Sequence, residues 1–427
     1  LYTVRNRDTE TGELVFDKIY DSQPMTQSSS NDGSRREFLD LMLHWDRMFW
    51  QAHSFAANIK FTEDQNITTQ NIGDDIRNSI SRKNKALAAQ VTYNFKNRYF
   101  VDLNCGYNGS ENFAVGHKWG FFPAFSVAWN IGEEPFIQKL CPWINMFKIR
   151  YSRGKVGSDG TYIGGNLVRF PYLYTIVRDG AGYTFGQVAG SNSYSGAYYS
   201  QVASPDVTWE VALKDDVGLD LVLFDTKFSL TVDYFQEHRT GIYMQRKYLP
   251  ATVGLESTPQ ANVGSVKSRG FDGNFKYEQR FGDWNVTVRG NMTYSKNQIG
   301  DYDEENNVYS YQYQRGYRVG QVRGLIAEGL FADYDDIRNS PKQTFGDVQP
   351  GDIKDNDVNG DGVVDDGDVC AIGATDRPNL IYGLGLSVQW KQLDFNIHFQ
   401  GAGKSTFMTY GKCVYAFSEN QWGHIFK

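Results

Sequence analysis

An acidic segment near the carboxyl end, DVNGDGVVDDGD from Asp357, has the residue spacing of an EF-hand calcium loop. Calcium takes six to eight oxygen ligands, and such a loop supplies them from positions 1, 3, 5, 7, 9 and 12, with glycine at position 6. Gly362 occupies position 6. The oxygen donors expected in this frame are Asp357, Asn359, Asp361, the carbonyl of Val363, Asp365 and Asp368.

Two features separate this segment from a calmodulin-type switch. Asp368 stands where most EF-hands have a bidentate glutamate, and its shorter side chain is expected to weaken the site. Pro350, Gly351 and Gly373 flank the segment, so we expect no helices beside it. The sequence therefore predicts a structural calcium loop between strands. The alternative is a turn without metal, held by hydrogen bonds from Asp and Asn side chains to the backbone.

Two groups of tyrosines are candidates for binding sugar rings, because aromatic faces pack well against the apolar faces of pyranoses. The groups are Tyr194, Tyr198 and Tyr199, and Tyr309, Tyr311, Tyr313 and Tyr317. Both groups lie in segments that we expect to be external loops. The alternation of the second group is also compatible with one more strand.

Motifs of catalytic sites are missing from the sequence. There is no GxSxG, HExxH or P-loop pattern, and no GxGxxG that opens a helix. The adjacent carboxylates Asp215 and Asp216 would point to opposite faces of a strand, which makes them poor candidates for a paired acid and base. His398 falls on a polar strand face, where we expect a lining or hydrogen-bonding role. The sequence thus predicts binding or transport and no enzyme activity.

The elements that carry these residues follow a period of two, which is typical of strands with one apolar face. Residues 87–95 alternate between apolar and polar, and the alternation resumes over 99–108 after a short turn. We expect about a dozen strands of the length that crosses a bilayer. The other clear examples are 147–152, 209–220, 228–234, 271–278, 284–294, 382–390 and 393–400.

Short and long connections alternate between these strands, as in outer-membrane barrels, where short turns face the periplasm and long loops face outside. Short turns are expected at 96–98, 224–226, 282–283 and 391–392. Long external segments are expected at 154–206, 237–262 and 297–379. Aromatic residues crowd the strand ends beside the short turns, which fits an interfacial girdle; they include Tyr93, Phe95, Tyr99, Trp390 and Phe395.

The composition agrees with a barrel and argues against several other classes of protein. The 427 residues include 15% aromatic side chains, and no apolar segment reaches the length of about 18 residues that a membrane-spanning helix needs. A formal net charge of -7 argues against a nucleic-acid partner. The cysteines contain no CxxC pair and indicate neither a zinc site nor a disulfide framework; they are Cys105, Cys141, Cys370 and Cys413.

Seven segments resemble, in order and spacing, the SusC/RagA family of TonB-dependent outer-membrane transporters from Bacteroidetes. They are YNGSENF from Tyr107, GFFPAFSVAWNIGEEPF from Gly120, FKIRYSRGKVGSDG from Phe147, SPDVTWE from Ser204, TVDYF from Thr231, NVGSVKSRGFDG from Asn262 and DVNGDGVVDDGD from Asp357. The resemblance implies an all-β fold: a transmembrane antiparallel β-barrel with long extracellular loops. Residues 1–427 would supply about half of a large plugged barrel.

The resemblance also implies a location, a function and partners. Family members are multi-pass proteins of the bacterial outer membrane that import nutrients, mostly oligosaccharides and in some relatives peptides. They pair with a SusD-like surface lipoprotein, and relatives suggest a dimer of transporter and lid pairs. The TonB complex acts on them through an N-terminal part. The plug, the TonB-contacting segment and the final strand are not identifiable in this chain, and neither is a signal peptide.

Two other interpretations stay open at the level of the sequence. A secreted, calcium-stabilised β-sandwich that binds or hydrolyses glycans would also show alternating strands and an aromatic core. A passive porin or adhesin barrel would show the same strands without a plug. Strands longer than the usual five or six residues, together with the alternation of short and long connections, favour the transporter over the sandwich.

Overall fold

The computed structural model describes residues 2–8, 10–18, 33–68, 77, 80–185, 193–247, 249–255 and 257–409. The chain divides into two compact units, Leu1–Arg36 with Asn66–Ser81, and Glu37–Gln65 with Arg82–Lys427. The first unit contains an antiparallel hairpin of β1 (Tyr2–Arg7) and β2 (Leu14–Lys18). The features discussed below lie in the second unit, apart from the first residues of β3 and the last residues of β4.

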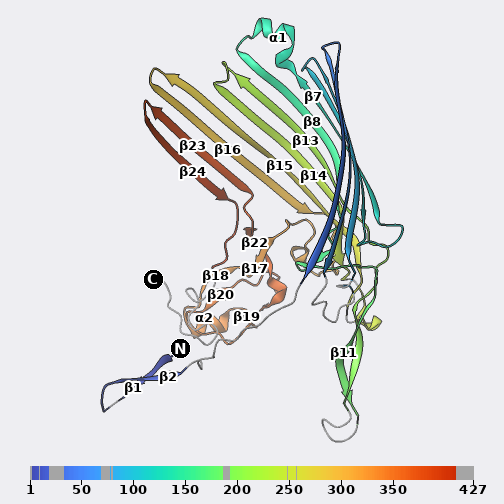
Figure 1. Ribbon diagram of the computed structural model, residues 1–427. Coiled ribbons are helices and arrows are strands. Elements are labelled where there is room, and N and C mark those ends of the chain that lie inside the picture. The colour runs from blue at the N-terminus through green and yellow to red at the C-terminus, as the bar shows by residue number, and fades with distance from the viewer. Residues whose placement is uncertain are drawn as a thin grey trace. The chain divides into compact units, whose positions relative to one another are not determined.

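One sheet of twelve strands dominates the second unit (Figure 1). Its order is β24-β23-β16-β15-β14-β13-β8-β7-β6-β5-β4-β3. The strands of this sheet therefore lie side by side in the order in which they follow one another in the sequence. The strands are β3 (Ser34–Phe49), β4 (His53–Thr68), β5 (Arg82–Phe95), β6 (Tyr99–Ser110), β7 (Trp119–Asn130), β8 (Ile144–Ser158), β13 (Glu210–Leu223), β14 (Phe228–Gln245), β15 (Gln260–Phe281), β16 (Trp284–Ile299), β23 (Leu380–Trp390) and β24 (Leu393–Gly403). This up-and-down order confirms the predicted dozen strands, and the alternative of two packed sheets is wrong.

One face of the sheet, called the apolar face here, carries large hydrophobic side chains that remain exposed. Met292 is 43% exposed and Leu103 is 55% exposed, although both lie in the middle of long strands. Other members of this face are Leu87, Phe125, Val217, Val232, Phe271, Leu384 and Phe399. Exposing so many apolar side chains to water costs free energy, whereas contact with hydrocarbon does not, so such a surface is stable only against hydrocarbon. The sheet therefore meets lipid on this side.

The height of the apolar face matches the hydrocarbon core of a bilayer. On β16 it runs from Trp284 to Tyr294, which is roughly 33 Å along a strand and roughly 25 Å across a membrane at a tilt of about 40°. Aromatic pairs mark both limits. Trp284 stacks on Trp390 with ring centroids 5.5 Å apart, and Tyr294 packs on Phe271 with centroids 5.6 Å apart. The Trp284–Trp390 pair lies beside the short turns, where the sequence predicts a girdle, and the Tyr294–Phe271 pair marks the opposite limit, for which the sequence made no prediction.

The short turns predicted from the sequence are confirmed. Lys96 and Asn97 have positive φ values of 49° and 57°, and Gly282 has a φ of 59°, as tight connections between antiparallel strands require. The expected external loop at 237–262 is wrong in extent. β14 continues to Gln245 and β15 begins at Gln260, so only 246–259 connect them. Polar residues on both faces hide the strand pattern there, because the strands extend beyond the membrane.

Three strands of the sheet, β3, β4 and β7, are not among the ranges predicted from the alternation. In β3, apolar side chains occupy both faces: Phe38 and Met42 are on one side, and Leu39 and Leu43 are on the other. The alternation that reveals the other strands is therefore weak in this segment. β3 nevertheless forms one edge of the sheet, and β24 forms the other.

A small buried core lies at the long-connection end of the sheet. It is made of Phe113, Phe122, Val207, Trp209 and Tyr243. The predicted strand 209–220 starts one residue too early, because Trp209 does not belong to β13. The residue precedes β13, is only 9% exposed, and donates a hydrogen bond of 3.1 Å from its indole Nε1 to the carbonyl of Lys118. This core ties the connections at 111–118 and 159–209 to the sheet.

The remaining elements are short and belong to the connections. The strands are β9 (Tyr162–Ile163), β10 (Asn166–Leu167), β11 (Thr175–Thr184), β12 (Ser193–Gln201), β17 (Gln321–Gly324), β18 (Ala327–Leu330), β19 (Lys342–Gln343), β20 (Ile353–Asp355), β21 (Val363–Val364) and β22 (Cys370–Thr375). The helices are α1 (Pro135–Leu140) and α2 (Tyr334–Asn339), with 3-10 turns η2 (Ile131–Glu133), η3 (Ala251–Val253), η4 (Ser310–Gln312) and η5 (Asp366–Asp368). No helix in the described part of the chain combines the length and the apolar composition that a membrane span needs.

The assignment of faces predicts opposite effects for two adjacent residues of β16. Val288 lies on the apolar face near the middle of the band, whereas Thr287 lies on the polar face opposite Glu278. We expect Val288→Arg to lower the free energy of unfolding in a bilayer by about 2–4 kcal/mol, because a guanidinium at the midplane loses its water. Thr287→Arg should change it by less than about 1 kcal/mol. Denaturant unfolding followed by tryptophan fluorescence measures both variants, and equal losses would contradict the assignment.

Candidate functional site

The polar face of the sheet carries a network of charges around Arg150 on β8. Its guanidinium lies 2.8 Å from Asp220 on β13 and 2.9 Å from Asp233 on β14. These carboxylates are 19% and 15% exposed, so the network is partly shielded from water. Because a carboxylate pairs with the guanidinium on each side, the arginine is held in a fixed position on the polar face.

Gly218 makes the network possible. It lies directly between Arg150 and Asp233 in the register of three adjacent strands. A Cβ at this position would overlap both the Asp233 carboxylate and the Arg150 guanidinium. Glycine therefore leaves the space through which the two charges meet above the backbone.

Acidic groups outnumber the arginine in this network. Asp272 is the cross-strand partner of Asp233, and Asp216 lies on the same face of β13. With Asp220, four carboxyl groups lie on this part of the polar face, and two of them contact the guanidinium. The middle of the polar face therefore presents net negative charge to whatever passes along it.

A second, balanced network lies nearer the long connections. Arg239 is 2.9 Å from Glu210 and 2.9 Å from Glu237, and Lys214 is 3.3 Å from Glu237. Toward the other side of the sheet, His398 lines a hollow of ≈ 340 Å³ together with Arg289. This is the polar, lining position predicted for His398. The polar face thus combines charged clusters with open, water-accessible recesses.

Glu134 organises the short-turn end of the sheet between η2 and α1. Its Oε1 accepts a hydrogen bond of 2.7 Å from Tyr99 Oη and one of 3.1 Å from Trp129 Nε1. These two bonds, with a smaller contribution from Arg98, lower the pKa of the Glu134 carboxyl below its usual value. The carboxylate therefore stays ionised and anchors the polar edges of two girdle aromatics, whose rings stack 6.4 Å apart.

The predicted acidic loop is held by its own side chains. Asp357 Oδ1 accepts a hydrogen bond of 2.6 Å from the Gly360 N–H, and Asp357 Oδ2 accepts one of 2.8 Å from the Gly362 N–H. Asp368 is completely buried and accepts hydrogen bonds from the N–H groups of Val358 and Asp365. Gly360 and Gly362 both have positive φ values, of 75° and 88°. The loop therefore has the tight curvature that the EF-hand spacing predicts.

The donor chemistry of the loop fits a hard cation, since five carboxylates and one side-chain amide lie on twelve consecutive residues. Asn359 and Asp365 also accept backbone hydrogen bonds, of 2.8 Å and 2.6 Å. Among the described residues, no group of three or more His, Cys, Asp or Glu side chains has an arrangement that could hold a metal ion. In this structure the loop oxygens instead accept from backbone N–H groups, and Val363 begins a two-residue strand.

The tyrosines of the second predicted group serve the folding of the loop in which they lie. Tyr309 and Tyr311 stack with centroids 5.5 Å apart around η4 and form no strand. Tyr311 Oη donates a hydrogen bond of 2.7 Å to the Gly367 carbonyl in the acidic loop. Tyr317 lies beneath the guanidinium of Arg323 at 4.9 Å. These contacts connect residues 309–323 to the acidic loop.

The first group lies on a separate hairpin of β11 and β12. Tyr194 is 64% exposed, and its ring contacts Phe185 at 5.9 Å. Tyr199 packs on Tyr174 at 5.5 Å. Tyr198 pairs with Val177 across the hairpin. Tyr174, Tyr183 and Phe185 were not among the predicted residues, but they extend this aromatic surface.

Three of the four cysteines lie among the described residues. Cys105 lies on β6 between Ala89 and Pro123 in the register, where it acts as a small side chain. Cys105, Cys141 and Cys370 are free. Cys413 lies outside the described residues.

The Arg150 network predicts that replacing Arg150 and replacing Arg153, both on β8, will change the stability by different amounts. Arg150→Met should lower the free energy of unfolding by about 1–3 kcal/mol, because it leaves Asp220 and Asp233 without a counter-charge. Arg153→Met should cost less than about 1 kcal/mol, since its pair with Asp215 is 47% and 31% exposed. Denaturant midpoints measure both losses. Adding Asp233→Asn to Arg150→Met should recover part of the stability, and a further loss would contradict this account.

Comparisons with known proteins place this geometry in a family. Residues 2–416 match the family model for the TonB dependent receptor-like, beta-barrel domain. TonB-dependent receptor P3 of Formosa agariphila is 25% identical over 339 residues, which cover 75% of this chain and 32% of that protein. TonB-dependent receptor SusC of Bacteroides thetaiotaomicron is 23% identical over 323 residues, which cover 73% of this chain and 30% of that protein.

A solved structure shares the fold. The RagAB peptide importer in its closed-closed state superposes with a TM-score of 0.63 at 16% identity, over 88% of this chain and 43% of that chain. The chain spans about a third of the length of the curated relatives that it matches. Its open sheet is therefore a partial barrel. The chain belongs to the family of TonB-dependent receptor-like β-barrels, which are proteins of the outer membrane.

Proposed function

We propose that the protein containing this chain imports a nutrient across the outer membrane in a TonB-dependent manner, and that its main cargo is an oligosaccharide. The observation that carries the proposal is the division of the sheet into two faces. The apolar face fits hydrocarbon, while the polar face combines fixed charge networks with recesses such as the one beside His398. A sheet with these two faces can line a water-filled path, so the role proposed for it is transport and not catalysis.

The exposed aromatic hairpin supports an oligosaccharide as the cargo. Tyr174, directly before β11, is 64% exposed, Tyr183 on β11 is 68% exposed, and Tyr194 on β12 is 64% exposed. Flat rings exposed to this extent, on strands that hold them in place, suit stacking against sugar rings. The main alternative cargo is a peptide, which is what the structurally similar RagAB complex imports by its description. The charged polar face suits peptide backbones and termini, so that the two cargoes must be separated by experiment.

The proposed partners follow from the same relatives. A SusD-like surface lipoprotein would cover the long-connection end, where the β11–β12 hairpin lies, and two such transporter and lid pairs would form a dimer. The TonB complex would act through a part of the protein other than the residues described here. The similarity to SusC supports this assembly.

Uptake by cells that carry the whole protein tests the proposal. Labelled oligosaccharides should accumulate in cells with the protein and TonB, and accumulation should fall to background when either is removed. Tyr194→Ala with Tyr199→Ala should weaken oligosaccharide binding on the order of tenfold, because stacking contributes about 1 kcal/mol per ring. Tyr334→Ala is the matched control, since this tyrosine is 63% exposed on α2, away from the hairpin. Uptake of peptides with no uptake of oligosaccharides would make the peptide the cargo.

We further propose that calcium binds the acidic loop through Asp357, Asn359, Asp361, Val363, Asp365 and Asp368. The ion would supply the positive charge that these carboxylates lack and would hold the loop closed. The EF-hand spacing and the positive φ values of Gly360 and Gly362 support the proposal.

Limited proteolysis of the whole protein tests the calcium proposal. We expect a chelator to accelerate cleavage within 340–370, and added calcium to restore protection. Asp357→Asn with Asp361→Asn should abolish the calcium effect, because both changes remove ligand charge. Asp335→Asn, an exposed acidic residue on α2, should leave it intact. Cleavage that ignores both chelator and calcium would leave the turn held by hydrogen bonds alone.

A further inference from the structure

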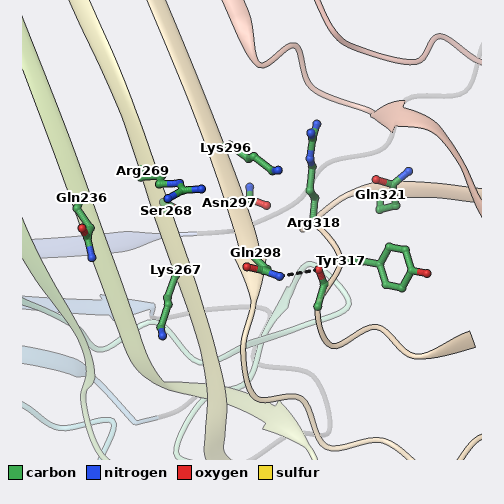
Figure 2. Close-up of a pocket in the computed structure, with 11 residues that line it drawn as sticks. Gln236, Lys267, Ser268, Arg269, Lys296, Asn297, Gln298, Tyr317, Arg318 and Gln321 are labelled. Atoms are coloured by element: carbon green, nitrogen blue, oxygen red, sulfur yellow. Dashed lines mark hydrogen bonds between the residues drawn. The ribbon is translucent and has the colours of Figure 1, made fainter. Parts of the chain in front are cut away.

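Four cationic side chains gather on the outward surface of the sheet just beyond the apolar face. Lys267 and Arg269 lie on β15, Lys296 lies on β16, and Arg318 lies in the following loop (Figure 2). They surround a hollow of ≈ 360 Å³. We call these four residues the basic cluster.

The strand register places the basic cluster on the lipid-facing side. Arg269 is the cross-strand partner of Lys296, two residues beyond the pair of Phe271 and Tyr294. Side chains two residues apart on a strand share a face. Arg269 and Lys296 therefore lie on the same face as Phe271 and Tyr294, one step nearer the long connections. The step is roughly 7 Å along the strand, which brings the charges from the aromatic rim to the headgroup level.

The loop brings Arg318 into the same surface. The pairing of β16 with β23 ends at Tyr294. Beyond that residue, 316–319 form hydrogen bonds with the same edge of β16. Ile299 N–H donates a hydrogen bond of 2.8 Å to the Tyr317 carbonyl, and Val319 N–H donates one of 2.8 Å to Asn297 Oδ1. Gln298 Nε2 also donates to the Gly316 carbonyl at 3.0 Å. Arg318 is therefore fixed beside the end of β16 and does not hang from a free loop.

The basic cluster differs from the two charge networks of the polar face in lacking acidic partners. On the polar face, Arg150 and Arg239 each pair with two carboxylates. None of the four residues of the basic cluster forms an ion pair with any carboxylate in the described part of the chain. Asp215, the one acid in the same cross-strand row, is paired with Arg153 at 3.3 Å. The cluster thus presents uncompensated positive charge directly above the lipid-facing band.

We propose that the basic cluster binds the phosphate groups of a phosphorylated lipid in the outer leaflet of the outer membrane. Clusters of lysine and arginine beside a membrane-spanning segment bind anionic headgroups, and arginine matches phosphate with two parallel hydrogen bonds. The acyl chains of the same lipid would lie along Phe271 and Met292, which are 39% and 43% exposed directly below the charges. The combination of phosphate sites and an adjoining apolar track fits a lipid better than a soluble anion.

Native mass spectrometry of the whole protein in detergent tests the proposal. The probes are bisphosphorylated lipid A, its dephosphorylated counterpart and inorganic phosphate. We expect the bisphosphorylated lipid to bind at least on the order of tenfold more tightly than the dephosphorylated one, and Arg269→Gln with Lys296→Gln to weaken it by a similar factor. Arg269→Lys with Lys296→Arg keeps both charges and should retain binding within about threefold.

A control and a second variant keep the test decisive. Arg280→Gln with Lys391→Gln removes two exposed cations at the short-turn end and should leave lipid binding unchanged. If Arg269→Gln with Lys296→Gln fails to fold, Lys267→Gln with Arg318→Gln replaces it. Equal binding of the two lipids, or equal binding by the wild type and the glutamine variants, would overturn the proposal. Displacement of the lipid by inorganic phosphate at equal concentration would also overturn it, since the site would then belong to a free anion.

Discussion

The need to pair every backbone N–H and C=O group in a medium without water determines the rest of this structure. A strand in hydrocarbon can satisfy these groups only through its two neighbours, so the sheet grows as one continuous meander of long antiparallel strands. The one proline within the central strands illustrates the constraint. Pro123 of β7 has no N–H, and the ladder between β7 and β8 ends at the adjacent residue, Ala124, which pairs with Gly154.

Alternation along these paired strands separates two environments, and the charges follow the separation. Within the band, ionisable groups lie on the polar face, where Arg150 meets Asp220 and Asp233 across three strands. On the outward face of β16, the first cation is Lys296, two residues beyond Tyr294, where headgroups replace hydrocarbon. The cations of the Arg150 and Arg239 networks find carboxylates on adjacent strands. The basic cluster on the outward face has no such partner, so by our proposal its counter-charge comes from the membrane. The proposed lipid site and the proposed transport wall are consequences of the same alternation.

Much of the sheet was predictable because a two-residue period is a local property of the sequence. The hairpin of β5 and β6, the turn at 96–98 and the strands β23 and β24 all follow from it. The failures occur where another requirement replaces the period. β3 carries apolar residues on both faces, and Trp209 packs against Phe113 and Phe122, which lie about 90 residues earlier in the chain. A contact at that separation leaves no trace in the local pattern.

The candidate site was predictable only in part for the same reason. The acidic loop could be located because its side chains bond to backbone groups within twelve residues. The sequence also places Arg150, Asp220 and Asp233 on polar strand faces, but Asp220 and Asp233 lie 70 and 83 residues from Arg150. Only the register of β8, β13 and β14 brings them together, with Gly218 leaving the necessary space. A shift of one residue in any of these strands would turn the charges into lipid and Val217 or Leu219 into water. The membrane penalises that shift on both faces at once, so it fixes the register on which the charge networks depend.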